Sequence, residues 1–244
     1  MAGQFRFDGD AQVGDIVTIN GAEAHHAIKV RRVRIGEQLN LTNGVTHSFT
    51  GEVVEAADYL SVRILTRAQI VAHKLSFVLV QALAKGDRDE LAIQAASEIG
   101  VSRVMPWQAN RSVSRWEGSK VEKQVTRWQA ICDEACKQSL QPLFTSVEQP
   151  VTSRQISEQI KKSSGLWLIL DPTASASIVD LALPEEGEIF LLVGPEGGIS
   201  PEEIESFEQC GAKGVRLGAS VLRTSTAGVA ALSVLSARAG LWNK

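Results

Sequence analysis

Two segments near the C-terminal end decide the fold: IFLLVGPEGGISPEE, residues 189–203, and VRLGASVLRTSTA, residues 215–227. In each, an apolar run typical of a buried strand ends in a glycine-containing loop, and a helix start follows at once. Ser200, Pro201 and Glu203 predict the first of these helices, because they match the N-cap, the first-turn proline and the reciprocal acid of a capping box. Two such units in succession predict two loops at the carboxyl ends of neighbouring parallel strands, where open α/β sheets bind ligands.

Residues 71–244 are therefore expected to form an α/β domain with a mostly parallel sheet. Its strands are apolar nearly throughout, as strands covered on both faces must be. They are predicted at residues 75–83, 101–106, 166–170, 189–193 and 215–217.

Recognisable end signals bound the helices of this domain. Asp87 and Glu90 predict a capping box after the first strand, and Gly100 predicts the end of that helix. A long charged helix with one apolar stripe is expected over residues 120–137, and the last helix is expected to open within residues 224–226.

Residues 1–70 are expected to form a small all-β domain. Turn residues separate its short strands, and Asn43-Gly44 predicts a hairpin. Among the strands lies HHAIKVRRVR, residues 25–34, the most concentrated positive patch of the chain. On charge alone this patch fits a solvated face and a phosphate-binding surface about equally well. The strands are predicted at residues 15–19, 38–42, 51–54 and 60–65.

Composition limits the class of protein. The chain has 244 residues, 44% of them hydrophobic, and a formal net charge of −3, which gives no global reason to expect a nucleic-acid partner. No apolar run reaches the length of a membrane span and no secretion signal opens the chain, so a cytoplasmic protein without membrane contact is expected. The three cysteines are sparse and lack nearby histidines, so we expect reduced thiols and no metal site.

The glycine loops indicate what kind of ligand the site binds. Neither the Walker pattern nor the Gly-x-Gly-x-x-Gly dinucleotide pattern is present, and Glu196 would repel a pyrophosphate. Glycines beside a carboxylate suit a positively charged ligand that needs close backbone approach, such as S-adenosylmethionine. The alternative is that these glycines only make tight turns, an explanation that two successive loops weaken.

Both loops closely resemble the signature of the RsmE family of SPOUT methyltransferases, whose members methylate N3 of a uridine in 16S ribosomal RNA. The resemblance covers essentially the whole chain. Further matching motifs occur in the family's order, at residues 25–34, 85–88, 98–101, 110–112 and 134–139.

The resemblance implies a PUA-like RNA-binding barrel, followed by a domain with a C-terminal trefoil knot. It also implies a homodimer packed through the knot, with 16S ribosomal RNA or the small ribosomal subunit as the partner. S-adenosylmethionine is expected to lie between the two loops and the turn after Leu170. The residues implied in cofactor binding are Leu170, Val193, Gly194, Glu196, Gly197, Gly198, Leu217, Gly218, Val221, Leu222, Thr224, Thr226 and Ala227. Those implied in RNA binding are His25, Lys29, Arg31, Arg32, Arg34, Lys85, Arg88 and Arg111.

Methylation at N3 requires the uracil to lose a proton, and two residues are candidates for this chemistry. Arg223 could stabilise the negative charge that spreads to the uracil oxygens, or could clamp an RNA phosphate. Glu196 is the nearest obvious carboxylate to take the proton, although it could equally hold its own loop or a helix start by hydrogen bonds. No metal is needed for either role.

Three positions depart from the family pattern. Ser225 stands where the family usually has Glu, Ala95 where it usually has Lys, and residues 140–144 lack the usual arginines. These departures leave open two alternatives: a related knotted methyltransferase that acts on transfer RNA, and a non-catalytic RNA-binding protein that keeps the cofactor pocket.

Overall fold

The computed structural model describes residues 3–242, which divide into two compact units. The first unit runs to Ala72 and also contains Cys136–Phe144. The second comprises His73–Ala135 and the chain from Thr145 onward. The first unit is therefore not one continuous stretch of sequence.

Hydrogen bonds attach the segment Cys136–Phe144 to the N-terminal part of the first unit. Thr42 Oγ1 donates to the Pro142 carbonyl at 2.7 Å, and Gln4 Nε2 donates to the Gln141 carbonyl at 2.7 Å. A boundary placed near residue 70 leaves out this segment, because these hydrogen bonds join residues 100 and 137 positions apart.

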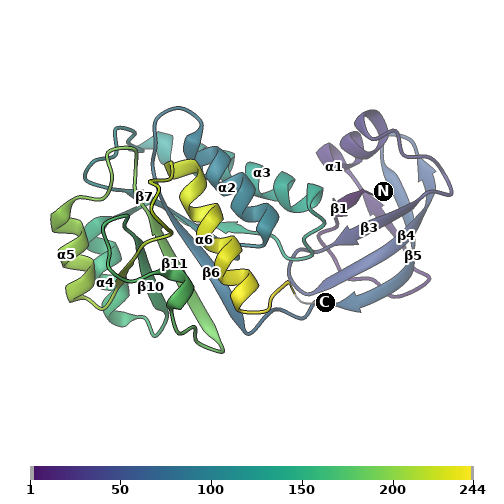
Figure 1. Cartoon of the computed structure of the whole chain (residues 1–244). Helices are drawn as coiled ribbons and strands as arrows, with labels where there is room; N and C mark the ends of the chain where they lie inside the picture. Colours follow the sequence, from purple (N-terminus) through teal and green to yellow (C-terminus); the bar gives the residue numbers. More distant parts are fainter. Residues whose placement is uncertain (1–2, 243–244) are drawn as a thin grey trace. The chain divides into compact units, whose positions relative to one another are not determined.

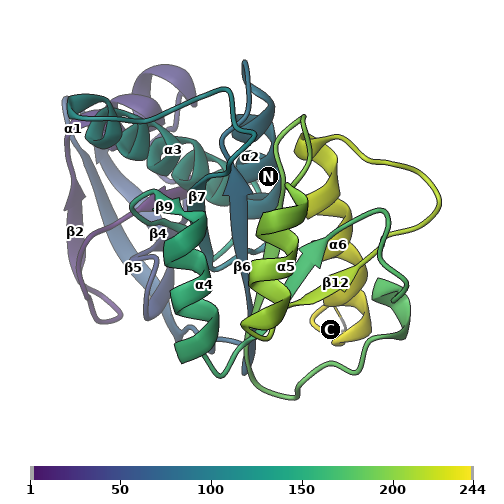
Figure 2. The same cartoon turned by 90° about the vertical axis from the view of Figure 1, so that its left-hand side faces the viewer.

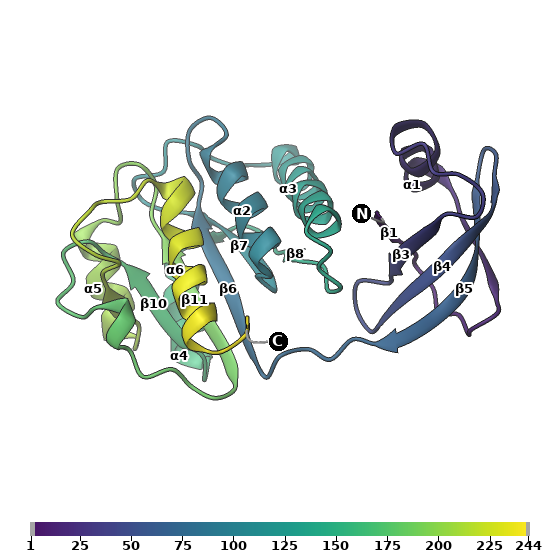
Figure 3. The same ribbon diagram turned by 45° about the vertical axis from the view of Figure 1, so that its right-hand side comes forward.

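A curled five-stranded sheet forms the first unit, in the order β1-β3-β4-β5-β2. β1 pairs with β3 in parallel and the other neighbours are antiparallel; Figure 3 shows β3, β4 and β5 side by side. The hairpin predicted at Asn43-Gly44 is confirmed, since residues 43–46 join β3 to β4. The strands are β1 (Gln4–Arg6), β2 (Ile16–Ile19), β3 (Gln38–Thr42), β4 (His47–Ala56) and β5 (Leu60–Gln69).

The first part of the positive patch, residues 25–30, lies on helical backbone, which the all-β prediction missed, and Arg31, Arg32 and Arg34 follow it. α1 (Gly21–His25) continues directly into a π-helical turn, His26–Val30. Ala24 and Ala27 are fully buried, because their small side chains let this segment pack closely against the sheet core. The charged residues between and after them point outward.

The second unit contains a parallel sheet in the order β12-β10-β11-β6-β7-β8, with β9 also paired to β7. Its central strands are buried on both faces, which explains their nearly continuous apolar sequence. The strands are β6 (Leu75–Ala82), β7 (Arg103–Gln108), β8 (Ser146–Val147), β9 (Val151–Thr152), β10 (Leu166–Leu170), β11 (Gly187–Val193) and β12 (Lys213–Val215).

Helices cover both faces of this sheet. α2 (Arg88–Ile99) and α6 (Thr224–Arg238) lie side by side over β6, as Figure 1 shows, and α3 (Ser119–Gln138) contributes Trp128 to the same core. α4 (Ser153–Lys162) and α5 (Pro201–Gln209) cover the other face, and Figure 2 shows them next to each other. The mostly parallel α/β fold predicted for this part of the chain is confirmed.

The C-terminal part of the second unit crosses back over the sheet and contacts the loop between β10 and β11. After β12 at the sheet edge, the chain returns to α6 over the centre of the sheet. The loop between β10 and β11 lies against this returning segment. The Ile178 N–H donates to the Arg216 carbonyl at 3.0 Å, and Arg238 Nη1 donates to the Ile178 carbonyl at 2.9 Å.

Several local predictions were wrong. Asp87 occupies the N-cap position of α2, but its side chain caps nothing; the buried Asp89 accepts from the N–H groups of Ala84 and Glu90 instead. β7 and β12 are shifted by about two residues, and β8, β9 and α4 were missed. β10 lies between β11 and β12, so the two loops do not follow neighbouring strands.

Candidate functional site

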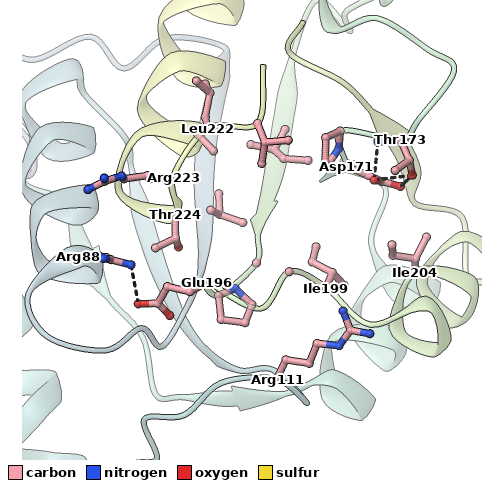
Figure 4. Close-up of a pocket in the computed structure, with 18 of the residues that line it drawn as sticks. Arg88, Arg111, Asp171, Thr173, Glu196, Ile199, Ile204, Leu222, Arg223 and Thr224 are labelled. Carbon is pink, nitrogen blue, oxygen red and sulfur yellow. Dashed lines mark hydrogen bonds and ion pairs between the residues drawn. The ribbon is translucent and has the colours of Figure 1, made fainter. Parts of the chain in front are cut away.

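A pocket of about 540 Å³ opens in the second unit, where β10 and β11 end and α6 begins. Both predicted loops reach it, and the turn after β10 lies between them because β10 separates β11 from β12. Figure 4 shows this arrangement of side chains. The lining residues are Arg88, Arg111, Leu170, Asp171, Pro172, Thr173, Val193, Gly194, Pro195, Glu196, Gly198, Ile199, Pro201, Ile204, Val221, Leu222, Arg223, Thr224 and Ala227.

The loop after β11, residues 194–199, is here called the first loop. Glu196 holds it to the start of α2: its Oε1 accepts from the Lys85 N–H at 3.0 Å and from Arg88 Nη1 at 3.4 Å. Arg111 Nη1 donates to the Gly197 carbonyl at 3.0 Å. The first loop is therefore fastened from both sides before any ligand binds.

The helix start after the first loop is fastened as well. Ser200 and Glu203 form the predicted capping box of α5, and Pro201 is the first helical residue. The buried Glu203 carboxylate also accepts from the Asn110 N–H at 2.7 Å and from the Ser153 hydroxyl at 2.5 Å. One buried acid thus joins α5 to the segments that follow β7 and β9.

Two positions of the first loop favour glycine, Gly194 because of close packing and Gly198 because of its backbone conformation. A Cβ on Gly194 would lie 2.7 Å from Ile199 Cγ1 and 3.0 Å from the Ile199 nitrogen. Gly198 has a φ of 72°, a left-handed conformation that favours glycine. Its N–H donates to the Pro195 carbonyl at 2.9 Å, which closes the turn.

The second loop, residues 216–223, is open by contrast. A Cβ on Gly218 would meet no atom within 4 Å, and Val221 is 78% exposed. Arg223 stands at the N-cap position of α6, and within residues 3–242 its guanidinium has no ion-pair partner. A smaller pocket of about 50 Å³ adjoins this loop and is lined by Leu217, Gly218 and Ser220, among others.

Most of the residues predicted for cofactor binding meet at these two pockets. Leu170, Val221, Leu222 and Ala227 line both of them. Gly197 and Thr226 line neither: Gly197 contacts Arg111, and Thr226 is exposed on α6. The two candidate catalytic residues, Glu196 and Arg223, both line the larger pocket.

The residues predicted for RNA binding fall into two groups. In the first unit, His25, Lys29, Arg31, Arg32 and Arg34 are all exposed. No ion pair joins them to any other residue in the described part of the chain. In the second unit, the remaining three surround the first loop: Lys85 through its backbone, and Arg88 and Arg111 through their side chains.

Sequence reasoning expected the turn after β10 at the cofactor but named none of its side chains as site residues. Asp171 and Thr173 line the larger pocket, and Thr173 donates to the Asp171 carboxylate through its N–H and its hydroxyl, each at 2.8 Å from Oδ1. The signal was present, because Asp171-Pro172 directly follows a buried strand at the ligand-binding edge of the sheet. Ile199 and Ile204 supply part of the apolar wall and had no comparable signal.

Burial and helix ends shape the electrostatics around the first loop. Burial raises the pKa of the Asp89 carboxyl, which lies just beyond the Lys85–Arg88 turn. The pKa of Glu202 is lowered, first by its own N–H at the start of α5 and then by Ser200. Residues 3–242 hold no cluster of three metal-ligating side chains, and no helix among them is long and apolar enough to span a membrane.

Family models match both units. One described as an RNA methyltransferase domain matches residues 72–236, and one described as an RNA methyltransferase PUA domain matches residues 19–65. Among curated proteins, the ribosomal RNA small subunit methyltransferase E of Mycobacterium bovis is 37% identical over 98% of this chain and 93% of its own length.

Two solved structures share the fold, each covering 98% of this chain and 98% of its own. A methyltransferase of Legionella pneumophila in complex with the cofactor SAM has 31% sequence identity and a TM-score of 0.87. A ribosomal RNA small subunit methyltransferase E of Neisseria gonorrhoeae bound to S-adenosyl methionine has 26% identity and a TM-score of 0.88.

Proposed function

This chain belongs to the ribosomal RNA small subunit methyltransferase E family, and on that premise we propose that it methylates N3 of a uridine in 16S ribosomal RNA with S-adenosylmethionine. The family membership confirms the resemblance that the sequence carries. The observation that supports the activity is the pocket between the two loops, in a chain that matches its relative over 98% of its length.

The pocket fits the cofactor in size and character. About 540 Å³ is within the range of small-molecule sites, and in the smaller pocket beside it the open space at Gly218 allows a ligand to approach the backbone closely. The carboxylates of Asp171 and Glu196 suit a ligand that carries a sulfonium and an ammonium. S-adenosylmethionine supplies a methyl group whose departure from the sulfonium leaves a neutral thioether.

The chain's own residues then have to accept a proton and stabilise a negative charge. The N3–H bond of uracil breaks, the new N3–methyl bond forms as the sulfur–methyl bond breaks, and negative charge spreads transiently to the two uracil oxygens. Arg223 is the charge stabiliser in this proposal, because it lines the pocket and has no carboxylate partner among residues 3–242. Glu196 holds the first loop through Oε1, and its Oε2 remains able to accept the N3 proton.

RNA docking is assigned to the exposed cations of the first unit. Arg31, Arg32 and Arg34 have no ion-pair partners in the described chain, so phosphates could bind them without breaking an existing ion pair. Replacing all three with Ala should weaken RNA binding and flatten its salt dependence by about 0.9 log–log unit for each phosphate that is no longer neutralised. The rate at saturating RNA should stay unchanged; a lower saturating rate would contradict a docking role.

We also propose a homodimer that packs through α6. This helix is small and apolar almost all round, and only one of its faces is buried against β6 and α2 in the single chain. Val229 and Ala230 remain partly exposed on the outward side. Sedimentation of the intact protein should give twice the mass of the chain, and a monomer at all accessible concentrations would contradict this assignment.

Transfer of labelled methyl from S-adenosylmethionine tests the function directly. Small-subunit RNA from a strain lacking this gene should accept label, and nucleoside mass spectrometry should identify 3-methyluridine. Label in transfer RNA instead would support the transfer-RNA alternative. Tight RNA binding without any transfer would support the non-catalytic alternative.

A further inference from the structure

A buried polar side chain from the sheet reaches the start of α6. Gln81 lies on the same face of β6 as Leu75 and Leu79, and it is fully buried. Its Nε2 donates to Thr224 Oγ1 at 2.9 Å and to the Ala82 carbonyl at 3.1 Å. Burying an amide costs free energy, so its presence in an apolar row calls for a reason. Within the described residues its Oε1 accepts no hydrogen bond. A fully hydrogen-bonded amide is therefore not the reason for its burial.

The two acceptors determine which way the amide faces. Rotating the Gln81 amide group by about 180° would place its Oε1 against the Ala82 carbonyl, and two acceptors would then face each other. Nε2 therefore faces Thr224, and the Thr224 hydroxyl oxygen receives a hydrogen bond there. Its own proton has to point in another direction.

That direction leads to the pocket. Thr224 is only 6% exposed, it lines the larger pocket, and within residues 3–242 no acceptor takes its hydroxyl proton. Figure 4 shows it at the start of α6, and Arg223 and Glu196 line the same pocket. Gln81 thus turns Thr224 into a directed donor.

The helix end reinforces this donor. Side chains cap α4 and α5, where Thr152 and Ser200 each accept from a backbone N–H. α6 has Arg223 at its N-cap position and no side-chain cap within the described chain. The positive end of a fifteen-residue helix is therefore open beside Thr224, which favours negative charge at that place.

We propose that the Thr224 hydroxyl, directed by Gln81, donates a hydrogen bond to a carbonyl oxygen of the target uracil as N3 loses its proton. Thr224 is then a catalytic residue and Gln81 a positioning residue. The inference rests on the proposed function. The uracil is favoured over the cofactor as the acceptor because the neighbouring Arg223, which has no carboxylate partner among residues 3–242, would repel a sulfonium or an ammonium.

A donor to the uracil anion lowers the pKa of N3–H, so its loss moves the rise of the pH–rate profile to higher pH. The other charged groups that line the pocket are Arg88, Arg111, Asp171, Glu196 and Arg223. Of these groups, Glu196 could shift the pH–rate profile in the same way. The pH–rate profile of Glu196→Gln is therefore measured for comparison.

Thr224→Val tests the donor, because it removes the hydroxyl and keeps the shape. We expect kcat to fall roughly a hundredfold, as for loss of one oxyanion donor. The profile should move up by about one pH unit, the size of a hydrogen bond to a charged group. Affinity for S-adenosylmethionine by calorimetry should not change. Thr224→Ser should restore the rate, and Thr126→Val, at an exposed position of α3 outside the pocket, should behave as wild type.

Gln81→Met and Gln81→Glu test the positioning role. Met leaves the Thr224 hydroxyl free to rotate, and a carboxyl group accepts its proton and turns it away from the pocket. Each should lower kcat and move the profile in the same direction as Thr224→Val. Combining either with Thr224→Val should add nothing, because both act on one hydrogen bond. If one of the two Gln81 variants fails to fold, the other still tests the positioning role.

A wild-type rate and profile in folded Thr224→Val would overturn the proposal. So would full additivity of the Gln81 and Thr224 substitutions, which would make Gln81 merely structural. Failure of the proposed function looks different, since the wild-type protein itself would then leave uridine N3 unmethylated.

Discussion

The two loops of the pocket both follow an apolar strand and both contain glycine, but they differ in how they are held. Glu196, Gly197 and Glu203 tie the first loop and its helix to α2, to Arg111 and to Asn110. The second loop has a hydrogen-bonded anchor at each end, Arg216 to the Ala174 carbonyl and Thr224 to Gln81. Between these anchors, its N–H groups donate to no backbone carbonyl within residues 3–242. One loop is preformed and the other has room to close on a ligand.

This difference teaches that a glycine loop can serve two purposes. In the first loop, glycine lets the chain pack against itself at Gly194. In the second, Gly218 faces open space, so its lack of a side chain matters only when something else occupies that space. The same residue type therefore supports folding in one loop and ligand approach in the other.

The largest effect is expected where the first loop is anchored. Glu203→Ala removes the acceptor for the Asn110 N–H, the Ser153 hydroxyl and the Ser200 N–H. Leaving one buried and two part-buried donors unpaired should lower the free energy of unfolding by about 3 kcal/mol, measured by chemical denaturation. Glu202→Ala, on the exposed side of the same helix turn, is the matched control and should have little effect. Equal stability of the two variants would mean that the first loop is not held as described.

The second prediction compares a proposed catalytic residue of the second loop, Arg223, with a residue that holds the first loop in place, Arg111. Arg223→Ala should lower kcat roughly a hundredfold, the usual cost of losing one charge-stabilising donor, and leave stability unchanged. Arg111→Ala, which frees the Gly197 carbonyl, should instead weaken S-adenosylmethionine binding at nearly constant kcat. A loss of RNA affinity and salt dependence in Arg223→Ala, with kcat unchanged, would make Arg223 a phosphate clamp.

Local signals predicted much of this site. The capping box of α5, the glycines and the apolar strands are all set by residues within a few positions of one another, so the sequence displays them directly. The hydrogen bonds that the sequence did not reveal join distant positions. Gln81 and Thr224 are 143 residues apart, and Asn110 and Glu203 are 93 apart.

The fold predictions failed for the same physical reason. Asp87 has the right spacing for a cap, yet the buried Asp89 receives the N–H groups, because tertiary packing decides which acid turns inward. The position of β10 between β11 and β12 is a matter of strand order, which no local pattern encodes. That order brings the turn that contains Asp171 between the two loops at the pocket.

A third prediction compares the two glycines directly, by measuring S-adenosylmethionine affinity. Gly218→Ala should fold normally and bind the cofactor roughly tenfold more weakly, because a methyl group there displaces only a ligand. Gly194→Ala should lower both stability and affinity, since its methyl group meets Ile199 at 2.7 Å. If Gly218→Ala bound the cofactor like the wild type, the ligand would not approach the second loop as closely as proposed.

The smallest expected effect is a change in hydrogen exchange. Amides in residues 218–222 have no backbone acceptor within the described chain, whereas the Gly198 and Ser200 N–H groups are already bonded to Pro195 and Glu203. Cofactor at four times its dissociation constant should slow exchange in the second loop about fivefold, if exchange occurs only from the unliganded protein. Exchange of the Gly198 and Ser200 amides should be slow already and should change less, because their hydrogen bonds do not depend on the ligand. Equal slowing of both loops would mean that the first loop also closes on the cofactor, and the contrast between a preformed loop and an open one would not hold.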